Sequence, residues 1–126
     1  MNTKLIISTL IFLFSSVSVS ACTNLSSSSE LLSCKKEVEA TSRAKMQKAY
    51  LNLDEYLSGA VDYQKKIKLS QESWAKSATQ NCDVYSYFAE EGSIAHDIAI
   101  SECMASEYKS REEFIISLSD VVEQFF

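Results

Sequence analysis

The chain has 126 residues, with 12 basic and 17 acidic side chains and a formal net charge of −5 at pH 7. This length fits one domain with a single core. The acidic balance disfavours nucleic acid and anionic membrane surfaces as partners, because both attract basic proteins. A cationic partner is the natural expectation, although an acidic surface can equally serve solubility alone.

The first 21 residues have the pattern of a secretory signal peptide. Lys4 precedes an apolar run from Leu5 to Phe14, and small residues follow up to Ala21. The run is shorter than the roughly 20 apolar residues of a membrane-spanning helix. We therefore expect a mature domain of residues 22–126 that is periplasmic or secreted and has no transmembrane segment. Since Lys4 is the only charged side chain removed, 11 basic and 17 acidic residues leave a net charge of −6.

The four cysteines form an even set, which in a small exported domain predicts two disulfides. Of the three possible pairings, we favour Cys22 with Cys34 and Cys82 with Cys103. Each of these loops is short enough to join neighbouring segments, and each closure contributes about 3 kcal/mol. No CxxC or Cys/His spacing typical of zinc occurs, so neither a metal nor a cofactor is expected.

A lipid anchor at Cys22 is the alternative use of the first cysteine. The sequence VSAC, which ends at Cys22, resembles a lipobox, in which this cysteine is acylated and becomes the mature N-terminus. Acylation would leave Cys34 without a partner. The disulfide interpretation uses all four thiols and is preferred.

Helix breakers are rare in the chain, which has no proline and only two glycines. Without period-two alternation, this composition predicts an all-α fold. The sequence LSSSSE at residues 25–30 supplies hydroxyl N-caps and an acidic first turn, so the first helix is expected from about Ser29 to Leu57. Its apolar residues recur at steps of three and four, with a few longer gaps: Leu31, Val38, Met46, Ala49, Tyr50, Leu53 and Leu57. Gly59 is either a break or a kink, because one glycine inside a helix costs only about 1 kcal/mol.

A second amphipathic helix is expected to continue to about Phe88. Its apolar side carries Ile67, Trp74, Ala78 and Cys82. The sequence AEEGS at residues 89–93 is the clearest turn, because Gly92 suits a left-handed C-cap and Ser93 an N-cap. The last helix carries Ile94, Ile98, Met104, Tyr108, Ile115, Leu118 and Val122. The predicted fold is a small antiparallel bundle of about three helices stapled by two disulfides, one of which joins the second helix to the third.

Several stretches of the chain carry a known pattern: MQKAYLNLDEYL from Met46, SQESW from Ser70 and EGSI from Glu91. Together with the cysteines, they resemble the lysozyme inhibitor LprI-like N-terminal domain family in order and spacing. The matching positions are Tyr50, Gln71, Trp74, Cys82, Gly92, Ser93, Cys103 and Arg111, and Cys22 and Cys34 match the family's early cysteine pair. The resemblance covers nearly the whole mature chain. It implies an exported helical domain from a family named after a member that inhibits lysozyme.

The chain also departs from the family pattern. Met46 and Gln47 stand where the family favours Leu-Asn, and Glu91 replaces the first glycine of a Gly-Gly-Ser. Ala78 and Thr79 stand where an Arg-Asp pair is usual. A family activity that required this pair would be absent here.

The segment between Cys82 and Cys103 is the predicted binding surface, because it sets carboxylates beside aromatic residues on a restrained turn. The candidate contacts are Asp83, Tyr85, Tyr87, Glu90, Glu91 and Asp97. Lysozymes are typically cationic, so we expect a non-enzymatic inhibitor that occludes the cleft of a lysozyme-like peptidoglycan hydrolase. The alternatives are an envelope protein-binding module and an immunity protein for one effector. In the plainer interpretation, Gly92 and Ser93 only form caps and the glutamates are ordinary surface residues.

The large side chains also have structural interpretations. Two of the three aromatic residues Tyr85, Tyr87 and Phe88 are expected to face the core, since adjacent positions on a helix cannot all point inward. Trp74 is expected to be the largest core side chain. Arg111 is expected to pair with a carboxylate on a neighbouring helix or with carbonyl groups of the turn.

His96 is the only histidine, one helical turn after Ser93 and directly before Asp97. Adjacent residues on a helix do not face each other, so Asp97 is not expected to orient His96 as a catalytic triad requires. We therefore expect His96 to be exposed to solvent or to lie at the start of a helix. Without a nucleophile motif, a metal cluster or a phosphate-binding loop, no enzymatic activity is expected.

Overall fold

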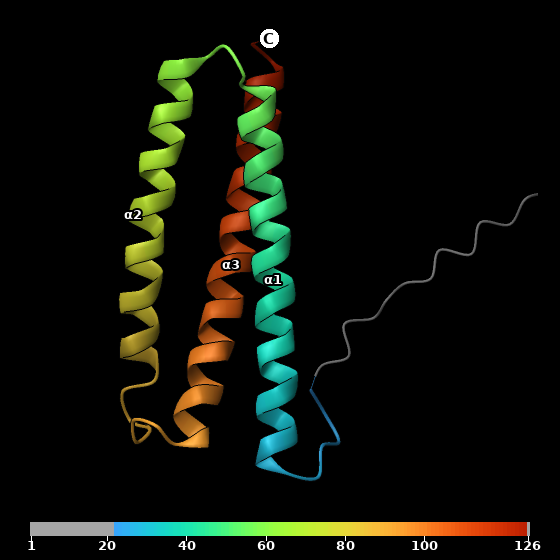
Figure 1. The fold of residues 1–126 in the computed structure, drawn as a ribbon, viewed down its shortest axis with the longest axis vertical. Helices are drawn as coiled ribbons and strands as arrows, with labels where there is room; N and C mark the ends of the chain where they lie inside the picture. The colour runs from blue at the N-terminus through green and yellow to red at the C-terminus, as the bar shows by residue number, and fades with distance from the viewer. Residues whose placement is uncertain (1–21, 126) are drawn as a thin grey trace, which may run out of the picture.

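The fold is a bundle of three helices, seen here in a computed structural model that describes residues 22–125. The helices are α1 (Ser28–Tyr56), α2 (Val61–Tyr85) and α3 (Ile94–Glu123) (Figure 1). Since no strand occurs in the described part of the chain, the all-α prediction is confirmed. The expected signal peptide, residues 1–21, lies outside the described residues.

Helix α1 begins with a capping box. The Ser27 hydroxyl accepts a hydrogen bond from the Glu30 backbone N–H at 3.2 Å, and the Glu30 carboxylate accepts from the backbone N–H and the hydroxyl of Ser26, both at 2.9 Å. These hydrogen bonds lower the pKa of Glu30. A disulfide joins Cys22 to Cys34, with 6.0 Å between the Cα atoms, so the segment before α1 is tied back to the helix as predicted.

Gly59 ends α1 and does not kink it. Its φ of +104° lies in the left-handed region, which costs a glycine nothing. The turn closes with a hydrogen bond of 2.8 Å from the backbone N–H of Ala60 to the carbonyl of Leu57. The Gln64 side-chain amide then donates to the Asp54 carbonyl at 2.9 Å, so the start of α2 is held against the end of α1.

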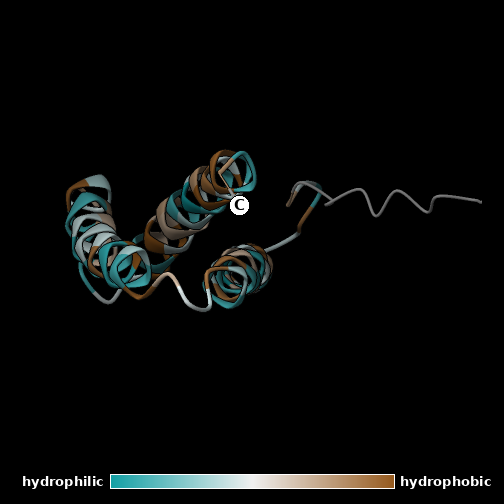
Figure 2. Cartoon of the chain, turned by 90° about the horizontal axis from the view of Figure 1, so that it is seen from above, coloured by the Kyte–Doolittle hydropathy of each residue, from teal (hydrophilic) through white to brown (hydrophobic). Residues whose placement is uncertain are grey.

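Helix α3 is central to the packing, because both other helices lie along it while α1 and α2 touch each other only sparsely (Figures 1 and 2). Consecutive helices are antiparallel, as predicted. The closest pair, α1 and α3, is therefore parallel. The buried core consists of Met46, Leu53, Leu57, Ile67, Ile115 and Val122. All six come from the half of the bundle next to the α1–α2 turn.

The other half of the bundle is held by a covalent bond and by polar contacts. The predicted disulfide between Cys82 and Cys103 joins α2 to α3, with 5.5 Å between the Cα atoms. Lys35 on α1 forms an ion pair of 2.6 Å with Glu102 on α3. No helix within residues 22–125 has the length and apolar character needed to cross a membrane.

Candidate functional site

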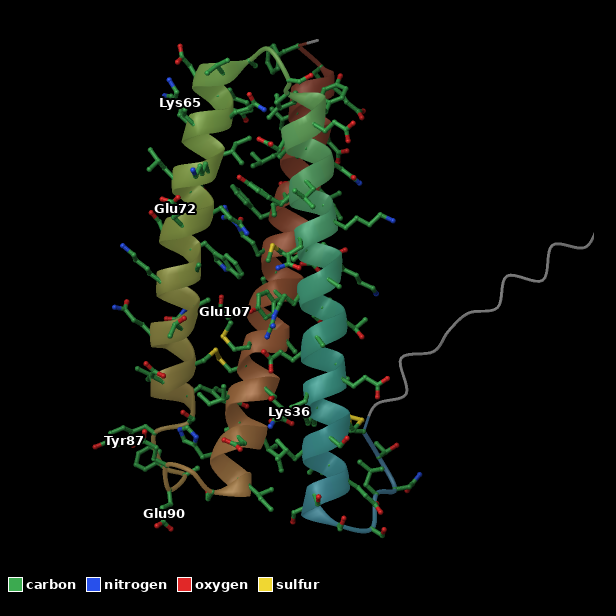
Figure 3. All side chains as sticks on the ribbon, viewed as in Figure 1. Lys36, Lys65, Glu72, Tyr87, Glu90 and Glu107 are labelled. Carbon is green, nitrogen blue, oxygen red and sulfur yellow. A yellow bond between two sulfur atoms is a disulfide. The ribbon has the colours of Figure 1, made fainter. Side chains whose placement is uncertain are left out.

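The candidate binding surface lies at one end of the bundle, where α2 leads into α3. We call the last turn of α2, the connecting segment 86–93 and the first turn of α3 the stapled end, because the Cys82–Cys103 disulfide closes it. Tyr87 and Glu90 both project outward from this end (Figure 3). These two side chains of the stapled end therefore point away from the core.

The connecting segment consists of two successive turns. In the first, the backbone N–H of Ala89 donates to the Ser86 carbonyl at 2.9 Å, and in the second the N–H of Ser93 donates to the Glu90 carbonyl at 3.0 Å. Gly92 has a φ of +80°, which the second turn requires and which favours glycine. Four hydrogen-bonded residues thus fix the path of a connection that is only eight residues long.

The predicted boundaries of this turn are partly wrong. Helix α2 ends at Tyr85, not near Phe88, and its C-cap is Ser86, not Gly92. The buried Ser86 hydroxyl donates to the Asp83 carbonyl at 3.3 Å, an alternative to the helical hydrogen-bond ladder. The prediction for Ser93 is confirmed, because its hydroxyl caps α3 by accepting from the backbone N–H of residue 96 at 3.1 Å.

The expectation that two of the three aromatic residues face the core is wrong. Tyr85, Tyr87 and Phe88 are 60%, 77% and 98% exposed. Because α2 ends before Tyr87, the last two rings are carried by the turn, and the large apolar core lies in the opposite half of the bundle. Tyr87 and Phe88 contact each other edge to face, with 5.3 Å between ring centroids and an angle of 84° between planes.

The carboxylates of the stapled end gather around these rings. An open depression is lined by Asp83, Ser86, Tyr87, Ala89, Glu90, Glu91 and His96. Of the predicted contacts, the structure thus brings four together, whereas Tyr85 and Asp97 lie outside this lining. The surrounding sequence contains no lysine or arginine between Lys76 and Lys109. The stapled end is therefore uniformly acidic.

His96 braces the connecting segment. Its Nε2 atom lies 3.3 Å from the Ser86 hydroxyl. The Ser86 hydroxyl thus has a partner on each side, the Asp83 carbonyl and the His96 ring, and the direction of the second hydrogen bond follows from the tautomer of the ring. The Nδ1 atom is buried and without a hydrogen-bond partner among the described residues, 3.8 Å from an Asp97 carboxylate oxygen.

The group of Ser86, His96 and Asp97 does not have the geometry of a hydrolase. Ser86 is only 2% exposed, so a substrate cannot reach its hydroxyl. The distance of 3.8 Å from Nδ1 to Asp97 exceeds a hydrogen bond, and the contact therefore does not orient the ring as a triad would. His96 sits in the first turn of α3, as expected. Its role in this geometry is to hold Ser86.

A second cluster lies in the middle of the bundle, around Arg111. The Nε atom of this buried guanidinium donates to the Gln71 side-chain oxygen at 2.8 Å, and one terminal nitrogen donates to the Ser70 hydroxyl at 2.9 Å. The guanidinium also stacks near two rings, 5.6 Å from the Trp74 centroid and 4.8 Å from that of Phe114. Arg111 thereby connects α3 with α2.

The predicted partner of Arg111 is wrong. No described carboxylate lies within ion-pair distance of the guanidinium, and its partners are neutral side chains of α2. Burial without a counter-charge lowers the pKa of Arg111. Trp74 is only partly buried and packs against the core without being its largest buried side chain, edge to face with Tyr108 at 5.7 Å between centroids. The Gln71 amide also reaches α1, where it donates to the Met46 sulfur at 3.1 Å.

Both clusters lie within the region that a family model matches. The model, described as Lysozyme inhibitor LprI, matches residues 20–114. The chain belongs to the LprI lysozyme inhibitor family. The comparison with curated proteins and the comparison with solved structures give no match. The two disulfides are typical of a protein that works outside the cytoplasm, and the family is one of lysozyme inhibitors.

The LprI pattern residues of this chain are framework residues. Tyr50, Gln71, Trp74 and Arg111 pack or hydrogen-bond within the bundle. The cysteine pair, Gly92 and Ser93 shape the stapled end. None of the exposed rings or carboxylates of that end belongs to the pattern. The residues that carry the resemblance in the sequence thus hold the stapled end in place, and other residues form its surface.

Sequence reasoning missed two residues of this LprI surface, Ser86 and Phe88. Ser86 gave no local signal, because its partner His96 is ten residues away on another helix. Phe88 carries the most exposed aromatic ring of residues 22–125, although the expected helix assigned two of three aromatics to the core. The sequence YSYF, which ends at Phe88, sets three aromatic rings around one serine.

Proposed function

We propose that this chain is an exported inhibitor of a lysozyme-like peptidoglycan hydrolase, which it blocks by placing the stapled end in the enzyme's cleft. The periplasm or the cell exterior is the proposed site of action. The main support for this proposal is that the chain belongs to the LprI family and has exposed aromatic rings among carboxylates on one restrained turn. That turn has no basic side chain. The described residues of the stapled end supply no catalytic group in reach of a substrate, so the mechanism is occlusion.

The charge distribution supports a cationic target. From residue 77 to residue 108 the chain has six carboxylates and no lysine or arginine: Asp83, Glu90, Glu91, Asp97, Glu102 and Glu107. The expected mature chain has a net charge of −6, and five of these six carboxylates have no lysine or arginine partner among the described residues, since only Glu102 is paired, with Lys35 of α1. A field of this kind accelerates association with a positively charged enzyme, more strongly at low salt.

The rigidity of the stapled end supports occlusion. The disulfide, the two hydrogen-bonded turns and the contact between Ser86 and His96 all restrain the same short segment. A surface that is ordered before binding loses little conformational entropy when it enters a cleft.

The proposal is tested with purified, oxidised residues 22–126 added to several types of lysozyme in a cell-wall lysis assay. We expect a dose-dependent loss of activity for at least one cationic type. Glu90→Gln/Glu91→Gln should slow association, whereas Asp120→Asn/Glu123→Gln, which removes the same charge near the C-terminus, should not. No inhibition at high molar excess would refute the proposal, and capture of one other periplasmic protein would then favour the envelope-module or immunity function.

A further inference from the structure

We infer that Tyr87 and Phe88 are the anchor of this inhibitor. The pair enters a sugar-binding subsite of the cationic hydrolase and supplies most of the affinity, whereas the surrounding carboxylates mainly set the rate of association. This inference rests on the proposed function, and it assigns separate tasks to the rings and to the charges of the stapled end.

The first step is the exposure of the rings. Tyr87 and Phe88 are the central residues of the first turn, and no other described residue covers Phe88, which is 98% exposed. Large aromatic side chains gain more from burial at an interface than any other kind, and they are enriched among the residues that dominate binding energy. Two adjacent rings that a turn holds in water are therefore a surface that only a binding partner would bury.

The second step is the order of the pair. The two rings lie edge to face, with 5.3 Å between their centroids. Ser86, directly before them, is buried and held by both Asp83 and His96, so the turn that carries the rings cannot swing freely. The rings consequently enter a cleft with little entropy left to lose, which favours slow dissociation.

The third step is the choice of partner. Sugar-binding subsites offer flat apolar walls for the faces of pyranose rings, with hydrogen-bond donors at the edges. Tyr87 and Phe88 present rings of similar size, and Asp83, Glu90 and Glu91 line the same depression as Tyr87 and can act as acceptors. A second copy of the chain would bring two acidic ends together, and peptidoglycan itself carries carboxylates. Charge therefore disfavours both and leaves the cleft of a cationic enzyme as the fitting partner.

The test compares Tyr87→Ala/Phe88→Ala with the control Leu51→Ala/Leu69→Ala, which removes two exposed apolar side chains elsewhere. Both variants should keep the wild-type thermal melt, because none of the four side chains is buried. We expect the aromatic variant to raise the inhibition constant about 100-fold, mostly through faster dissociation, and the control to change it less than about threefold. A soluble chitooligosaccharide should compete with the wild-type chain for the enzyme.

The outcomes separate the anchor from the proposed function. If the wild-type chain inhibits and the aromatic variant inhibits equally well, the anchor inference is wrong and the proposed function stands. If the wild-type chain inhibits no lysozyme, both fall. Sedimentation of the wild-type chain with insoluble peptidoglycan in the absence of enzyme, or its dimerisation through Tyr87 and Phe88 in ultracentrifugation, would also overturn the inference, because the rings would then have another occupant.

Discussion

The two disulfides are expected to contribute similarly to stability and very differently to inhibition. They close loops with sequence separations of 21 residues for Cys82–Cys103 and 12 for Cys22–Cys34. In the chain-entropy model, closures of these lengths contribute about 3.3 and about 2.8 kcal/mol at 25 °C. The two losses differ by only about 0.5 kcal/mol, so stability alone cannot account for a large difference in activity.

Their positions predict that difference. Cys82 and Cys103 flank the connecting segment and fix its two ends relative to each other, whereas Cys22–Cys34 ties the segment before α1 to that helix. Cys82→Ala/Cys103→Ala should therefore loosen the turns that carry the exposed rings. Cys22→Ala/Cys34→Ala should leave them in place. Alanine is the better replacement, because Cys82 is buried and a serine there would add a hydroxyl group to bury.

The assay measures the free energy of unfolding by urea denaturation and the inhibition constant at a temperature where all variants stay folded. We expect both disulfide variants to lose about 3 kcal/mol of stability. Only the Cys82–Cys103 variant should lose inhibition, with an inhibition constant raised roughly 10-fold or more. Its binding surface would have to become ordered at the moment of binding, which costs free energy. Equal loss of inhibition in both variants, or none in either, would refute the link between the staple and the binding surface.

Three further predictions concern stability. Gln71→Ala should cost about 1–3 kcal/mol, because it leaves the buried Arg111 Nε–H without an acceptor, and adding Arg111→Met should recover part of that loss in urea denaturation; strictly additive costs would contradict this reasoning. Ser93→Ala should remove the N-cap of α3 and lower the melting temperature by about 4–8 °C, unlike Ser77→Ala at an exposed mid-helix position. Burial raises the pKa of Tyr50 above its ordinary value of 10.0, so stability should fall as the pH rises past the unfolded pKa and through the higher folded one. Tyr50→Phe should show a smaller fall in unfolding free energy between about pH 8 and about pH 11, and an identical fall would show that this group is not responsible.

Local signals were sufficient to predict the helices and the disulfide pairing. The serine run before Glu30 marks the start of α1, Gly59 marks its end, and Ser93 marks the start of α3. Each of these features acts within four residues of the boundary that it sets. The thiols pair as expected because each disulfide closes a short loop, Cys22–Cys34 between the segment before α1 and that helix and Cys82–Cys103 between α2 and α3.

The features that could not be predicted depend on residues far apart in the sequence. Helix α2 has no glycine or proline near Tyr85, and its end is stabilised by Ser86, whose second partner His96 belongs to α3. The Arg111 guanidinium finds Gln71, 40 positions earlier, only because α2 and α3 pack in a particular register. Charge and spacing suggested a carboxylate partner for this arginine, but they carry no information on that register.

The replacement of the family's Arg-Asp pair has a physical consequence in this chain. Ala78 is fully buried, and it lies one helical turn before Cys82, on the face of α2 that the disulfide joins to α3. Thr79 instead points its hydroxyl to the Ala75 carbonyl, 3.1 Å away, on the exposed side. An arginine at position 78 would have to fill space that α3 occupies, so the alanine allows the two helices to approach next to the staple. The departure therefore changes how the stapled end is supported, and the exposed rings and carboxylates beyond it remain available for binding.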